Sequence, residues 1–127
     1  MKIPDNLKYT KDHEWVQVDG NTVTVGITDF AQGELGDIVY VEIETTGEEV
    51  AQGDIFGTIE AVKTVSDLFM PISGVVEEIN SGLEDNPEVI NEDCYGKGWM
   101  VKIKVTGDGS ELDDLLSSND YKEVIGS

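Results

Sequence analysis

The chain has very few of the side chains from which catalytic and metal sites are usually built. Its 127 residues include one histidine, His13, and one cysteine, Cys94. A lone cysteine cannot form a disulfide within the chain, which fits a reducing compartment. One cysteine and one histidine also fall short of any Cys/His metal site, so we expect no metal. The sequence has neither a phosphate-binding glycine loop nor a Gly-x-Ser-x-Gly motif, so we expect no catalytic residues.

Basic residues are scarce as well. Eight of them stand against 27 acidic residues, which gives a formal net charge of −19. Such a charge repels nucleic acid and anionic membranes, so we expect neither as a partner. It favours a monomer that meets basic surfaces on its partners, although solubility alone or a salt-adapted host explains the charge equally well.

Long apolar runs are absent from the sequence. No run reaches the 18 or more residues of a membrane span, and the N-terminus lacks the features of a signal or transit peptide. We therefore expect a cytoplasmic protein. Hydrophobic residues make up 39% of the chain, and the length suits one core, so residues 1–127 are expected to form a single domain.

What the sequence does contain is a series of short stretches that alternate between apolar and polar residues. In the last of them Trp99, Val101, Ile103 and Val105 share one face. Glycine-rich turns separate the stretches, which is typical of a β-sandwich or barrel. The expected strands cover residues 15–18, 22–27, 38–43, 55–59, 68–72 and 99–105.

One pair of these strands places a lysine at a turn. Lys63 lies between residues 55–59 and 68–72, with Gly53 and Gly74 as turn signals on either side. An amine on the tip of a β-hairpin is what a swinging-arm carrier presents to a ligase. An ordinary solvated lysine is the simpler explanation, because most lysines lie at the surface.

Helices are expected to be few and short. N-capping side chains precede two of them, since serine and threonine accept hydrogen bonds from the first free backbone N–H groups. The polar stretch 81–98 is expected to be an ordered surface loop. The expected helices cover 29–32 after Thr28, 111–116 after Ser110, and a segment starting at Asn119.

Motifs along nearly the whole chain resemble those of the glycine cleavage H proteins. The matching segments are 13–15, 26–32, 35–39, 60–63, 66–67, 71–74, 78–80, 90–91 and 98–99, followed by the C-terminal leucines. The resemblance implies a mainly β fold, a barrel-sandwich hybrid of the lipoyl/biotinyl type with short helices and a C-terminal helical cap. It also implies that Lys63 is an N6-lipoyllysine, so that lipoate is the covalent cofactor.

The chain departs from the family pattern at three positions. Ala61 and Thr64 replace the usual serine and alanine beside the lysine, and Cys94 replaces a loop proline. The related lipoyl domains of 2-oxoacid dehydrogenases and the biotinyl domains match less well, because neither carries the His13-Glu14-Trp15 segment.

The resemblance implies a carrier that catalyses no step itself. It would take an aminomethyl group from a pyridoxal-phosphate-dependent glycine decarboxylase to a tetrahydrofolate-dependent aminomethyltransferase, and its dithiol to dihydrolipoamide dehydrogenase. A lipoate ligase, or an octanoyl or lipoyl transferase, would attach the cofactor.

The resemblance also implies roles for particular residues around the lysine. Glu14 and Asp67, with Asp12 nearby, would form a cleft that protects the cationic intermediate, because a buried charge needs a partner. Glu60 and Gly74 would be read by the lipoylating enzyme. From sequence alone Asp67 is equally well explained as a turn residue. His13 is expected to be a structural residue, and Trp15 part of the core.

Two alternative functions use the same residues. An H-like relay protein that donates lipoyl groups to other enzymes would carry the same hairpin. An enzyme with Cys94 as nucleophile would need His13 as its base, 81 positions away in sequence.

Overall fold

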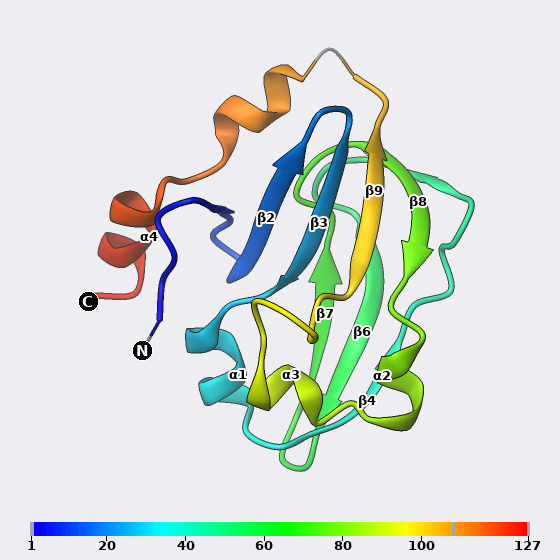
Figure 1. Cartoon of the computed structure of the whole chain (residues 1–127), viewed down its shortest axis with the longest axis vertical. Helices are drawn as coiled ribbons and strands as arrows, with labels where there is room; N and C mark the ends of the chain where they lie inside the picture. The colour runs from blue at the N-terminus through cyan, green and yellow to red at the C-terminus, as the bar shows by residue number, and fades with distance from the viewer. Residues whose placement is uncertain (1, 108, 127) are drawn as a thin grey trace.

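Two antiparallel sheets make up most of the computed structural model, which describes residues 2–107 and 109–126 (Figure 1). The larger sheet has the order β1 (Lys8–Tyr9), β2 (Glu14–Asp19), β3 (Thr22–Ile27), β9 (Val101–Val105), β8 (Gly74–Ile79), β5 (Glu49–Val50). The smaller sheet has the order β4 (Ile38–Glu42), β6 (Ile55–Ala61), β7 (Val65–Phe69). No strand pairing joins the sheets within the described ranges, so the hybrid is an open sandwich and not a closed barrel.

The core lies between the two sheets because the apolar side chains of each sheet point towards the other sheet. In β9, Val101 and Ile103 are fully buried, whereas Lys104 is exposed. This confirms the alternation predicted for the strand, although Trp99 lies ahead of it and is only partly buried. Residues 70–72, expected to continue β7, follow its end at Phe69 and are buried without strand pairing.

Helix α1 (Asp29–Leu35) begins and ends where the sequence provides caps. The Thr28 side-chain oxygen accepts a hydrogen bond from the Ala31 N–H at 3.2 Å, as predicted. Gly36, with a φ of 79°, stops the helix. The helix therefore runs one turn further than predicted and reaches the edge of the smaller sheet.

The prediction of a loop over residues 81–98 is wrong. Two four-residue helices, α2 (Gly82–Asp85) and α3 (Val89–Glu92), occupy it. Each buries one apolar residue, Leu83 and Ile90 respectively. A helix of one turn shows no apolar periodicity, which explains why a polar sequence concealed both.

The C-terminal region is helical, as predicted, but the details differ. A 3₁₀ helix η1 covers Ser110–Asp114, so Ser110 is its first residue and Gly109 holds the N-cap position. Helix α4 (Ser118–Val124) starts one residue earlier than predicted, after the capping side chain of Ser117. Three carboxylates and three leucines in residues 111–116 favoured an α-helix, but the short run closes with the tighter i→i+3 bonds.

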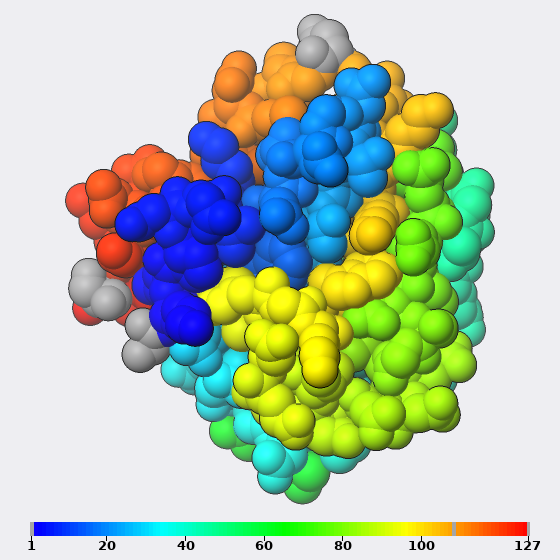
Figure 2. Space-filling view, in the orientation of Figure 1, coloured from blue at the N-terminus to red at the C-terminus, as the bar shows by residue number. Residues whose placement is uncertain are grey.

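The N-terminal segment packs against α4, and Figure 2 shows the two side by side on one face of the molecule. The rings of Tyr9 and Tyr121 stack with centroids 4.8 Å apart, and the Ser118 hydroxyl donates to Asp5 at 2.8 Å. Among the described residues, no helix is long and apolar enough to cross a membrane.

Candidate carrier site at the β6–β7 hairpin

Lys63 occupies the tip of the β6–β7 hairpin, as the sequence predicted. The last strand pair joins Glu60 to Val65, and the Ala61 N–H donates to the Thr64 carbonyl at 2.8 Å. In Figure 1 this tip projects beyond the sheets at the bottom of the molecule. The Lys63 side chain is exposed, and within the described ranges its amine makes no hydrogen bond or ion pair. This amine is therefore open to solvent and to other macromolecules.

The hairpin tip is fastened to the segment between α1 and β4. The Val62 N–H donates to the Asp37 carbonyl at 3.0 Å, and Ala61 pairs with Ile38. The end of the Lys63 side chain lies over Gly36, because a Cβ placed on that glycine would be 3.5 Å from Lys63 Cε. The lysine thus stands on a fixed support.

A cleft of about 350 Å³ opens beside the hairpin. It begins at Ser66, three positions along the chain from Lys63, and at Leu35, next to Gly36. Apolar side chains make most of its lining, and three carboxylates join them. The lining residues are Asp12, His13, Ile27, Phe30, Ala31, Glu34, Leu35, Ile59, Ser66, Asp67 and Leu68.

Two of the three carboxylates predicted around the intermediate line this cleft. Asp12 and Asp67 are both exposed there, and neither is paired with a basic side chain within the described part of the chain. The third lining carboxylate, Glu34, was not predicted. Ala31, Glu34 and Leu35 follow the i, i+3, i+4 spacing of one helix face, so a helix predicted up to Gly36 would have found it.

Glu14 does not line the cleft but lies in the protein interior. It is 2% exposed, and its carboxylate accepts hydrogen bonds from the Phe69 N–H at 2.9 Å and the Thr10 hydroxyl at 3.4 Å. Burial raises the pKa of Glu14 to about 8, against the opposing effect of the Phe69 hydrogen bond. At pH 7 most of this carboxyl is therefore protonated and carries no charge.

His13 has the structural role that the sequence predicted. Its Nδ1 lies 3.0 Å from the Tyr121 hydroxyl, which is also 2.7 Å from the Thr28 hydroxyl. Burial lowers the pKa of His13, although Asp12 and Glu34 act in the opposite direction. The ring is thus a neutral part of the cleft wall and ties α4 to it.

The two residues predicted for recognition by the lipoylating enzyme lie in different sheets. Glu60 is exposed on the outer side of the smaller sheet, between Tyr40 and Val65 on the neighbouring strands. Gly74 is buried at the start of β8 in the larger sheet. A Cβ there would collide with the Lys104 carbonyl oxygen, so this glycine is required by the approach of β8 to β9 and not by a tight turn.

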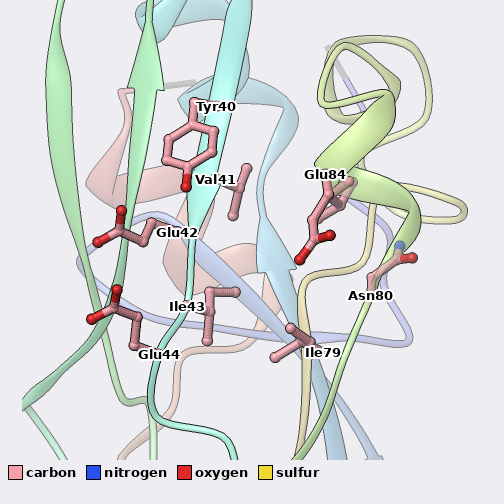
Figure 3. A pocket seen from close by; sticks show the side chains of 9 residues that line it. Tyr40, Val41, Glu42, Ile43, Glu44, Ile79, Asn80 and Glu84 are labelled. Atoms are coloured by element: carbon pink, nitrogen blue, oxygen red, sulfur yellow. The ribbon is translucent and has the colours of Figure 1, made fainter.

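A second cavity, of about 370 Å³, lies between the end of β4 and the β8–α2 connection (Figure 3). Glu42 and Glu44 lie along one side of it and Glu84 on the other, with Tyr40 above them. Within residues 2–107 and 109–126, no three His, Cys, Asp or Glu side chains are placed to hold a metal.

Cys94 is not placed to act as a nucleophile. It is 6% exposed, and burial raises the pKa of its thiol to about 12, so the reactive thiolate does not form near neutral pH. Its carbonyl accepts the Trp15 indole N–H at 2.8 Å, which fixes the ring in the core, as predicted for Trp15.

The comparisons with known proteins point to one family. The model of the family described as Glycine cleavage H-protein matches residues 7–127. The chain is 59% identical over 126 residues to the glycine cleavage system H protein of Staphylococcus haemolyticus and 58% identical to that of Staphylococcus carnosus, covering 99% of each chain. A crystal structure of a glycine cleavage system H protein from Mycobacterium marinum has a TM-score of 0.88 and 39% identity, with 98% of this chain and 100% of that one covered. The chain therefore belongs to the glycine cleavage H-protein family.

Proposed function

We propose that Lys63 carries lipoate through an amide bond and that the chain serves the glycine cleavage system as its lipoyl carrier. Members of the glycine cleavage H-protein family carry lipoate, and this chain is one of them. The observation that carries the choice of Lys63 is its exposed amine, unpaired among residues 2–107 and 109–126, at a hairpin tip beside a cleft of about 350 Å³. A relay of lipoyl groups to other enzymes has no such support, since relatives at 56–59% identity are named for glycine cleavage.

The residues around the tip fit the group. A lipoyl-lysine arm of roughly a dozen bonds reaches on the order of 14 Å, enough to enter a cleft that begins three residues away. Acylation removes the charge of Lys63, so the apolar side chains of Ile59, Leu68 and Phe30 can cover the arm without burying a cation. Bound lipoate supplies a disulfide that accepts a one-carbon aminomethyl cargo and is returned as a dithiol.

The carboxylates of the cleft hold the cationic cargo. Asp12 and Asp67 place their carboxylates on the cleft lining, where they attract an ammonium and disfavour its escape into water. Glu14 is buried beneath the cleft lining. It accepts a hydrogen bond from the Phe69 N–H on β7, and Phe69 is next in sequence to Leu68, whose side chain lines the cleft. A cation nearby would favour the ionised form of Glu14 and displace its proton.

The carrier has no chemistry of its own and meets its partners in turn. These are the pyridoxal-phosphate-dependent glycine decarboxylase, the tetrahydrofolate-dependent aminomethyltransferase and dihydrolipoamide dehydrogenase, with a lipoate ligase or an octanoyl or lipoyl transferase acting first. Glu60 suits recognition by the attaching enzyme because it is exposed on β6, three residues from Lys63. Gly74 contributes by keeping the sheet framework in place.

Intact-mass measurement of the protein incubated with lipoate, ATP and a lipoate ligase tests the assignment. We expect one lipoyl adduct on the wild type and none on Lys63→Arg, which keeps the charge and length of the side chain. Lys97→Arg is the matched control, since Lys97 is also exposed, and it should be modified like the wild type. A full adduct on Lys63→Arg would show that another lysine is the carrier.

A further inference from the structure

We propose that Asn91, on helix α3, is a positioning residue that fixes residues 36–38 as a seat for the hairpin tip and the Lys63 side chain. The proposal deepens the assignment of Lys63 as the carrier lysine and rests on it for its functional meaning. The contacts of Asn91 are present in the unmodified protein and can be tested there without lipoate.

The Asn91 side chain uses both ends of its amide to join two elements. Its oxygen accepts a hydrogen bond from the Ile38 N–H at 2.9 Å. Its nitrogen donates to the Gly36 carbonyl at 2.9 Å and to the Gln32 side-chain oxygen at 3.0 Å. The amide thereby clamps the end of α1 to the start of β4. Neither an apolar side chain nor a carboxylate can make all three bonds, because they require one acceptor and two donors, which a side-chain amide provides.

The clamped segment is the one that holds the hairpin tip. Asp37, between the two residues that Asn91 binds, offers its carbonyl to the Val62 N–H at 3.0 Å. Val62 is the residue immediately before Lys63. One hydrogen bond therefore separates the clamp from the tip, and this bond can keep its geometry only while the Asp37 peptide stays in place.

The end of the Lys63 side chain lies beside the same segment. A Cβ on Gly36 would lie 3.5 Å from Lys63 Cε and 3.9 Å from Nζ, which is ordinary van der Waals contact. Gly36 has a φ of 79°, and its N–H caps α1 by donating to the Gln32 carbonyl. In Figure 1 the short helices α1 and α3 lie side by side, close to the hairpin end.

The clamp also sets the cleft wall relative to the lysine. Ala31, Glu34 and Leu35 line the cleft from α1, and the same helix ends in the Gly36 carbonyl that Asn91 binds. An arm that starts from a fixed point near a fixed wall docks at a smaller entropic cost than one on a loose tip. Asn91 thus helps both the attaching enzyme, which reads a rigid tip, and the docking of the arm.

Hydrogen exchange of the Val62 amide, measured by NMR on the unmodified full chain, tests the clamp directly. We expect about tenfold faster exchange in Asn91→Ala, which equals about 1.4 kcal/mol of lost protection. Asn91→Asp is the second variant. It keeps the acceptor for Ile38, loses both donors, and should fold even if the alanine variant does not. Exchange at Val62 that stays at the wild-type rate in a folded Asn91 variant would overturn the proposal.

Asn80→Ala is the matched control. The Asn80 amide is also a clamp between backbone segments, donating to the Lys97 and Trp99 carbonyls at 2.8 Å and accepting from Gly82. It should lower the melting temperature by a similar amount and leave Val62 exchange unchanged. If Asn80→Ala accelerated Val62 exchange as much as Asn91→Ala does, the effect of Asn91 would be a general loss of stability. That result would overturn its positioning role.

The rate of modification by a lipoate ligase gives the functional readout. In the Asn91 variants we expect the KM for the carrier to rise several-fold while kcat changes little, because the reacting amine is intact but less often presented correctly. An unchanged KM with faster Val62 exchange would overturn the link to recognition. Failure of the Lys63 assignment looks different, because the adduct would then persist on Lys63→Arg.

Discussion

Two carboxylates expected to share one task, Glu14 and Asp67, lie in opposite environments. Asp67 is exposed in the cleft and in contact with water. Glu14 is 2% exposed, and the two hydrogen bonds that it accepts do not compensate for lost hydration. The charge of Glu14 therefore depends on what enters the cleft.

This difference gives Glu14 a measurable effect on stability. Its pKa is raised from 4.5 to about 8 in the folded protein, so the folded state binds the proton more tightly than the unfolded state does. The resulting stabilisation is complete below about pH 4.5 and is lost as the pH rises towards 8. Between pH 6 and 8.5 we expect the wild type to lose about 2 kcal/mol relative to Glu14→Gln, in urea unfolding at each pH.

The glutamine variant is informative because it keeps an acceptor for the Phe69 N–H and cannot ionise. Asp67→Asn serves as the control at an exposed position, and its stability should follow that of the wild type across the same range. Parallel pH curves for Glu14→Gln and the wild type would mean that folding leaves the pKa of Glu14 unchanged.

At the scale of elements, glycines show how differently a helix and a strand use the same residue. Gly33, inside α1, would meet nothing within 4 Å if it carried a Cβ. Gly26, in β3, lies against the buried Trp15 ring, and a Cβ there would be 2.7 Å from Trp15 Cε2. The helix glycine is thus dispensable for packing, whereas the strand glycine makes room for the ring.

Alanine at these two positions should change stability in opposite directions. Gly33→Ala is expected to stabilise the protein by roughly 0.5–1 kcal/mol, because alanine loses less backbone entropy in a helix. Gly26→Ala is expected to destabilise it by about 1–3 kcal/mol, because the Trp15 ring would have to move from its bond to the Cys94 carbonyl. Urea midpoints measure both, and a stabilised Gly26→Ala would show that the ring can move freely.

What the sequence could predict was local. The Thr28 cap, the turn at Lys63 and the alternation of β9 depend on residues a few positions apart, and all three were found. Asn91, in contrast, binds residues 53 to 59 positions away, and the collision at Gly74 involves a strand 30 positions later. Such contacts exist only in the folded chain, so no local sequence pattern predicts them.

At the scale of the whole molecule, the dominant feature is a charge that nothing within the chain balances. The formal net charge is −19, and among the described residues one ion pair is found, between Lys102 and Glu78 at 4.0 Å with both side chains largely exposed. An exposed pair of this kind contributes little. Most of the 27 acidic side chains therefore repel one another in the folded state, at distances shorter than in the unfolded chain.

Salt should for this reason stabilise the protein. The Debye length falls from about 30 Å at 0.01 M to about 8 Å at 0.15 M, which screens repulsion across the molecule. We expect the melting temperature to rise by roughly 2–5 °C over this range of sodium chloride, measured by circular dichroism at pH 7. Choline chloride should have the same effect, because the effect depends on ionic strength and not on the cation.

A triple variant at exposed positions tests the same repulsion by removing charge. Compared with the wild type, it should have a higher melting temperature at low salt and a smaller rise with salt; the substitutions are Glu44→Gln, Glu48→Gln and Glu77→Gln. A melting temperature that stays constant or falls with salt would contradict this prediction. It would show that charge repulsion does not affect stability, because the acidic side chains are widely spaced or are neutralised by bound cations.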